Sequence, residues 1–142
     1  MLGILIALLS GALMSIQGVF NTEVSKNTNI WISAGWVQLT ALLVCIAAWF
    51  FTGRGNILGL FQVENKYMLL GGVIGAFITF TVIKAMDGLG PARAVMLIVV
   101  SQLLVAYLIE VFGIFGVEKV GFEWKKLLGM ALAIGGIVIF KW

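Results

Sequence analysis

Residues 101–116 read Ser-Gln-Leu-Leu-Val-Ala-Tyr-Leu-Ile-Glu-Val-Phe-Gly-Ile-Phe-Gly, and they place one carboxylate, that of Glu110, inside an almost wholly apolar run. A charged side chain is costly inside a bilayer and usually has a function there. A helix rises about 1.5 Å per residue and a bilayer core is about 30 Å thick, so about twenty apolar residues are needed to cross it. Residues 92–112 supply that length, and we therefore predict a membrane-spanning helix over them.

The polar and small residues of this helix share one face. Gln102, Ala106 and Glu110 repeat at intervals of four, and Gly113 follows three residues later. Residues at these spacings lie above one another on a helix. We expect this face to point toward protein or toward a water-filled cavity, because lipid would not solvate the carboxylate.

The composition is that of a membrane protein. The 142 residues are 62% hydrophobic and 11% charged, and the mean hydropathy is +1.15. Long apolar runs separated by short polar breaks favour a helix bundle, whereas a barrel would alternate apolar and polar residues. The net charge of +3 is scattered, so no nucleic-acid partner is expected. Met1 to Ser10 lacks a basic start, which argues against a secretory signal.

We predict an all-α integral membrane protein that forms a single domain over residues 1–142. The expected spans are the apolar runs at residues 2–22, 30–51, 67–85, 92–112 and 123–141, of which the last is only marginally long. Small residues on one helix face let another backbone approach closely. The residues expected in this packing role are Gly3, Gly11, Gly18, Gly71, Gly75, Gly129, Ala133 and Gly136.

The amino-acid sequence in and directly after the fourth span resembles that of a known family. The pairs Gln102-Leu103, Ile109-Glu110, Phe112-Gly113 and Phe115-Gly116 are similar to the motif of the YdcZ-type inner-membrane exporters of the drug/metabolite transporter superfamily. Gln17 followed by Asn21, and Gly71-Gly72-x-x-Gly75, are also similar to the family pattern. Ser101, Glu110 and Val111 stand where the family pattern has glycine, aspartate and histidine. Because the chain has no histidine, it cannot move protons through that imidazole.

The resemblance implies a multi-pass protein of the cell inner membrane that exports a small organic metabolite or drug-like compound. Larger members of the superfamily look like two five-helix units of opposite orientation in one chain. Five helices would therefore be one half of an inverted repeat, the arrangement in which two halves rock about a site at the bilayer midplane.

The positive charges hardly favour either orientation in the membrane. With five spans, the side of the N-terminus carries Arg54, Lys66, Lys119, Lys125 and Lys126, and the other side carries Lys26, Lys84, Arg93 and Lys141. Orientation normally follows the excess of Lys and Arg in short loops. Either a few charges fix the orientation weakly, or the chain inserts both ways. We favour an antiparallel homodimer, followed by pairing with a separately encoded inverted partner chain.

Glu110 is the residue predicted to couple transport to protons or to hold a cation, because carboxylates in apolar surroundings exchange protons close to neutral pH. The alternative is that Glu110 lies near the end of its helix and is solvated among the lipid headgroups. Trp36 and Tyr107 could form aromatic walls for an organic cation; core or lipid-facing packing explains either residue as well.

Other polar residues could line a substrate cavity between the first, second and fourth spans. They are Gln17, Asn21, Gln38, Ser101 and Gln102. Hydrogen bonds between helices, worth about 1 kcal/mol each in lipid, explain the same residues without any substrate.

No catalytic constellation is present, so an enzyme is not expected. The sequence has no histidine, a single cysteine (Cys45) that excludes a disulfide or metal framework, and no phosphate-binding glycine loop followed by Lys and Ser or Thr. No cofactor is expected.

The leading prediction is a transporter that binds a small-molecule substrate and works by alternating access in a dimer. The alternatives are a passive channel at a dimer interface and a non-transporting membrane subunit of a larger complex.

Overall fold

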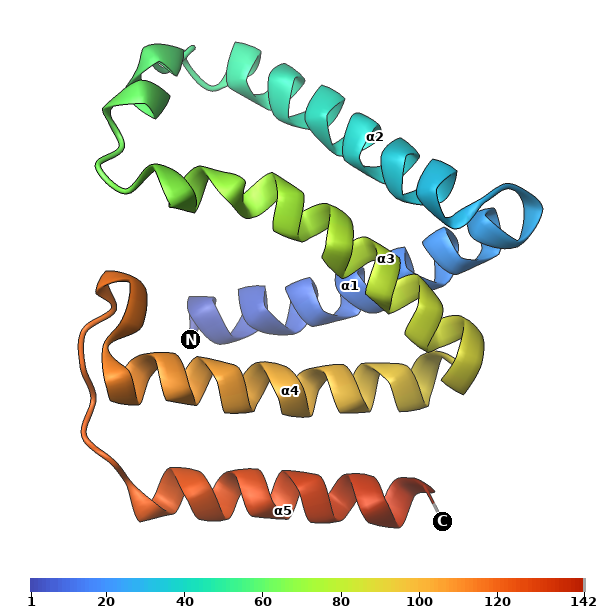
Figure 1. Cartoon of the computed structure of the whole chain (residues 1–142), viewed down its shortest axis with the longest axis vertical. Coiled ribbons are helices and arrows are strands. Elements are labelled where there is room, and N and C mark those ends of the chain that lie inside the picture. Colours follow the sequence, from blue (N-terminus) through green and yellow to red (C-terminus); the bar gives the residue numbers. More distant parts are fainter. Residues whose placement is uncertain (142) are drawn as a thin grey trace. The chain divides into compact units, whose positions relative to one another are not determined.

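The computed structural model describes residues 1–141 and consists of helices joined by short connections (Figure 1). The elements are α1 (Leu2–Asn27), α2 (Ile30–Phe51), the short 3₁₀ helices η1 (Ile57–Gln62) and η2 (Lys66–Leu70), α3 (Gly71–Leu89), α4 (Pro91–Phe112), the 3₁₀ turn η3 (Ile114–Gly116) and α5 (Trp124–Lys141). The described residues contain no strand, which confirms the expected all-α class.

Within residues 1–141, four helical segments are long and apolar enough to cross a membrane. They are α1, α2, the continuous segment Lys66–Leu89 formed by η2 and α3, and α4. The helix α5 is the fifth, and its crossing of the membrane stays a prediction. The chain divides into two compact units, residues 1–88 and residues 89–142. The first unit holds α1, α2 and nearly all of α3, and the second holds α4 and α5.

The helix α1 continues to Asn27, past the expected end of the first span at residue 22. Polar side chains in this extension bond to carbonyls of their own helix. Thr22 Oγ1 donates to the Gly18 carbonyl at 2.8 Å, and Ser25 Oγ donates to the Thr22 carbonyl at 2.7 Å. Side chains satisfied in this way are tolerated inside a helix, so the polar residues do not end it.

The first unit is most tightly packed where the end of α1, the start of α2 and the end of α3 meet. Ser33 Oγ on α2 donates a 2.7 Å hydrogen bond to the Asn21 carbonyl on α1, and the rings of Trp31 and Phe80 stack with centroids 4.7 Å apart. The helix α2 begins here because the Asn29 side chain accepts the Trp31 N–H at 2.8 Å. The buried residues of this junction are Gly18, Asn21, Thr22, Ser33, Ala34, Ile83 and Met86.

The second unit is a hairpin in which α5 returns alongside α4 (Figure 1). Pro91 starts α4 at a position that needs no amide donor. Gly113 ends α4 with φ of 65°, a left-handed conformation that glycine adopts without strain. The connection is tied back to α4 by a 3.0 Å hydrogen bond from the Val120 N–H to the Glu110 carbonyl. The beginning of α5 is thereby held near the end of α4.

Candidate functional site

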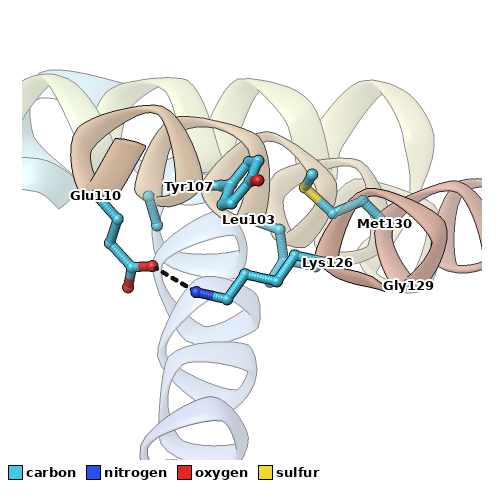
Figure 2. A pocket seen from close by; sticks show the side chains of 7 residues that line it. Leu103, Tyr107, Glu110, Lys126, Gly129 and Met130 are labelled. Atoms are coloured by element: carbon cyan, nitrogen blue, oxygen red, sulfur yellow. Dashed lines mark hydrogen bonds and ion pairs between the residues drawn. The ribbon is translucent and has the colours of Figure 1, made fainter. Parts of the chain in front are cut away.

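A cavity of about 370 Å³ lies between α4 and α5 in the second unit (Figure 2). Its lining residues are Leu103, Ala106, Tyr107, Glu110, Lys126, Gly129 and Met130. The α4 residues Leu103, Tyr107 and Glu110 follow one another at intervals of four and three, so they share one helix face. Lys126, Gly129 and Met130 likewise share a face of α5. The two faces meet because the hairpin sets the helices antiparallel.

Glu110 and Lys126 form an ion pair at the end of this cavity. The Lys126 Nζ atom lies 3.4 Å from Glu110 Oε2, and Figure 2 shows the two side chains extended toward one another. The Glu110 side chain retains 44% of its accessible surface and the Lys126 side chain retains 38%, so neither charged group is buried. Lys126 Nζ also lies 3.9 Å from Glu123 Oε1, one helical turn earlier on the chain. The Lys126 ammonium group therefore lies within ion-pair distance of two carboxylates.

Tyr107 is the buried wall of the cavity, with 9% of its surface exposed. Its hydroxyl oxygen accepts the Glu123 backbone N–H at 3.1 Å. That amide stands at the start of α5, where helix donors have no partner within the helix. Lys126 Nζ lies 5.8 Å from the centroid of the Tyr107 ring, within the range of a cation–π contact. Tyr107 thus anchors α5 to α4 and presents a ring face to the ammonium.

The remainder of the lining is apolar or small. Leu103, Ala106 and Met130 supply hydrocarbon or thioether surface, and a Cβ atom added to Gly129 would meet no atom within 4 Å. The absence of a side chain at Gly129 therefore leaves part of the volume open. A carboxylate and an aromatic face beside apolar walls can hold a positively charged group attached to an apolar body.

Two of the predicted site residues, Tyr107 and Glu110, are brought together in this cavity. Ser101 and Gln102 lie on α4 with exposed side chains and are not part of its lining. Glu110 lies two residues before the end of α4 and is half-buried. Its surroundings are thus intermediate between the apolar interior of a span and full solvation among the lipid headgroups. Its role in coupling stays a prediction.

The predicted polar residues of the first unit lie in different surroundings. Asn21 is buried at the junction of α1 and α2, whereas Gln17, four residues earlier, is exposed. Gln38 is half-buried next to α3, and its Nε2 atom lies 3.3 Å from where a Cβ of residue 75 would stand. Trp36 is 59% exposed. A substrate cavity that joins these residues to Ser101 and Gln102 stays a prediction.

The predicted packing residues also fall into two groups. Gly18 lies against Met86 of α3, and Gly75 lies against Gln38 of α2. Ala133 is half-buried and lines a small hollow together with Val100 and Leu103 of α4. For the remaining predicted glycines an added Cβ would meet no atom within 4 Å; these are Gly3, Gly11, Gly71, Gly129 and Gly136.

The sequence reasoning missed Lys126 and Glu123 as members of the site. The signal that could have found them is the short connection of residues 113–123 between two antiparallel helices. Such a connection places the first turn of α5 beside the last turn of α4, and Lys126 is one of two lysines in that turn.

A family model described as "Putative inner membrane exporter, YdcZ" matches residues 2–139. The chain belongs to this family. The resemblance read from the fourth span is thereby confirmed over almost the whole chain, and the family description and the four candidate spans make the protein a multi-pass protein of the inner membrane. The YdcZ family is one of exporters and not of enzymes. No curated protein and no solved structure matches the chain.

Proposed function

We propose that the protein exports a small organic molecule by alternating access, and that Glu110 is the carboxylate through which substrate binding is coupled to the conformational change. The observation that carries the proposal is the α4–α5 cavity, in which Glu110 and Tyr107 face a volume of about 370 Å³ with apolar walls. A site of this size suits a small molecule. Ionisable residues within membrane-spanning helices commonly mark substrate or ion pathways.

We further propose that α5 crosses the membrane and that the five helices form one half of an antiparallel dimer. The 18 residues of α5 extend about 27 Å, close to the thickness of a bilayer core. The open glycines on α1, α3 and α5 leave backbone surface that a second chain can approach closely. An inverted homodimer would supply the second half that alternating access requires.

The test compares the small molecules released into the medium by cells that produce the wild-type protein, the Glu110→Gln variant, or neither. We expect at least one compound to accumulate with the wild-type protein, and its export rate to fall at least tenfold in Glu110→Gln. The matched control is Glu118→Gln, because Glu118 is an exposed carboxylate in the α4–α5 connection, away from the cavity lining. Equal amounts of protein in the membrane must be shown for each variant.

The accumulating compound is then used in proteoliposomes that contain the purified protein. A carrier saturates and shows counterflow when unlabelled compound is present on the other side, whereas a channel gives flux that rises linearly with concentration. Linear flux would contradict alternating access and favour a pore at the dimer interface. If no compound accumulates with the wild-type protein, the proposed export is contradicted and the interpretation as a non-transporting subunit is favoured.

A further inference from the structure

The Lys126 ammonium lies among groups that could bind the positive charge of a ligand. It lies 3.4 Å from Glu110 Oε2, 3.9 Å from Glu123 Oε1 and 5.8 Å from the centroid of the Tyr107 ring. Two carboxylates and one aromatic face are the groups by which proteins recognise an alkylammonium ion. The end of the Lys126 side chain is itself such an ion, a primary ammonium on a hydrocarbon stem.

The contacts of Lys126 can exchange. Ion pairs between half-exposed side chains are weak, and the lysine stem is flexible. Glu123 lies three residues before Lys126 on the same chain segment, so the two can stay paired whether or not Lys126 contacts α4. Glu110, in contrast, belongs to α4 and has Lys126 as its one ion-pair partner among the described residues.

The rest of the cavity suits the body of a cationic ligand. Leu103, Ala106 and Met130 are apolar, and Gly129 leaves open volume beside the ion pair. A ligand with its ammonium at Glu110 would place a short hydrocarbon chain against these residues. Burial of that chain would add affinity that a bare inorganic cation cannot gain.

We propose that Lys126 occupies the cation site of the exporter while no substrate is bound, and that a small alkylammonium substrate binds Glu110 by displacing Lys126 onto Glu123. This inference rests on the proposed function and names its substrate class, a small organic cation with an apolar chain. Lys126 also keeps the Glu110 carboxylate paired after the substrate has left.

The experiment measures binding of n-butylammonium to the purified full-length protein in nanodiscs by titration calorimetry, with the heat of empty nanodiscs subtracted. A site that is occupied part of the time by a tethered competitor shows a weakened apparent affinity. Removal of the competitor in Lys126→Met is therefore expected to tighten binding about three- to fivefold, the range set by a weak ion pair. Lys126→Arg keeps the charge and is expected to bind about as the wild type does. Glu110→Gln is expected to weaken binding at least tenfold.

The matched control is Lys125→Met, which removes a neighbouring positive charge that no described ion pair uses. Its affinity is expected to stay at the wild-type value. Weaker or unchanged binding in Lys126→Met, or equal tightening in both lysine variants, would overturn the proposal. So would binding of n-butanoate that is lost in Lys126→Met, because the cavity would then be an anion site. Export that still depends on Glu110 would leave the proposed function standing in each of these cases.

Discussion

At the residue scale, the close approach of Gly18 to Met86 leaves little room for a side chain on α1. A Cβ at residue 18 would lie 2.8 Å from Met86 Sδ and 3.4 Å from Val82 Cγ1, and it would also meet Met86 Cε. We predict that Gly18→Val lowers the free energy of unfolding by about 1–3 kcal/mol, the usual cost of overpacking. Denaturation of the purified protein by SDS in mixed micelles measures this change.

Two further variants isolate the cause. Gly11 lies seven residues earlier on nearly the same face of α1, and an added Cβ there would meet no atom within 4 Å. Gly11→Val is therefore expected to leave the free energy of unfolding within about 0.5 kcal/mol of wild type. Met86→Ala combined with Gly18→Val should recover part of the loss, because the shorter side chain leaves room for the valine. An equal loss at both glycines would contradict the contact with Met86 as the cause.

The site could be predicted only in part from the sequence. The sequence singles out Glu110 as a carboxylate within an apolar helix, and Tyr107 as an aromatic residue of the same helix that could face an organic cation. Lys126 was missed because its place depends on the backbone of the connection, where Gly113 turns with φ of 65° and η3 follows. Periodicity also could not separate exposed Gln17 from buried Asn21, since their burial depends on where α2 crosses α1.

At the element scale, the hydroxyl of Tyr107 fixes the beginning of α5. We predict that Tyr107→Phe leaves the Glu123 N–H without its acceptor and costs about 1 kcal/mol locally. Amide hydrogen exchange over residues 123–127 should then be faster by about fivefold. Exchange in α2 should be unchanged in the same sample, because α2 belongs to the other compact unit. Unchanged exchange at the start of α5 would contradict the anchoring role of this hydroxyl.

The helices themselves were the most predictable feature. All five apolar runs of the sequence form helices in the structure, because a backbone in lipid must satisfy its own hydrogen bonds. The boundaries were less predictable. The polar residues at the end of α1 resemble a break in the sequence, yet their side chains bond to carbonyls of the same helix and let it continue to Asn27.

At the scale of the whole molecule, the near balance of positive charges and the open glycine faces lead to the same expectation. With five spans, five Lys and Arg residues would lie on one side of the membrane and four on the other, which gives little preference for one orientation. A Cβ added at glycines such as Gly3 and Gly11 would meet no atom of another helix within 4 Å among residues 1–141. Insertion of the chain in both orientations agrees with the near balance of positive charges, and an inverted second copy could pack against the open glycine faces.

The most direct test of this account is the orientation of the two chain ends in intact cells. Single cysteines are introduced by Gly3→Cys or Trp142→Cys in a Cys45→Ala background and labelled with a membrane-impermeant thiol reagent. Dual insertion predicts that about half of the molecules are labelled at each end, and that the two cysteines, introduced in separate chains, cross-link between chains. Complete labelling at one end and none at the other would contradict the antiparallel homodimer.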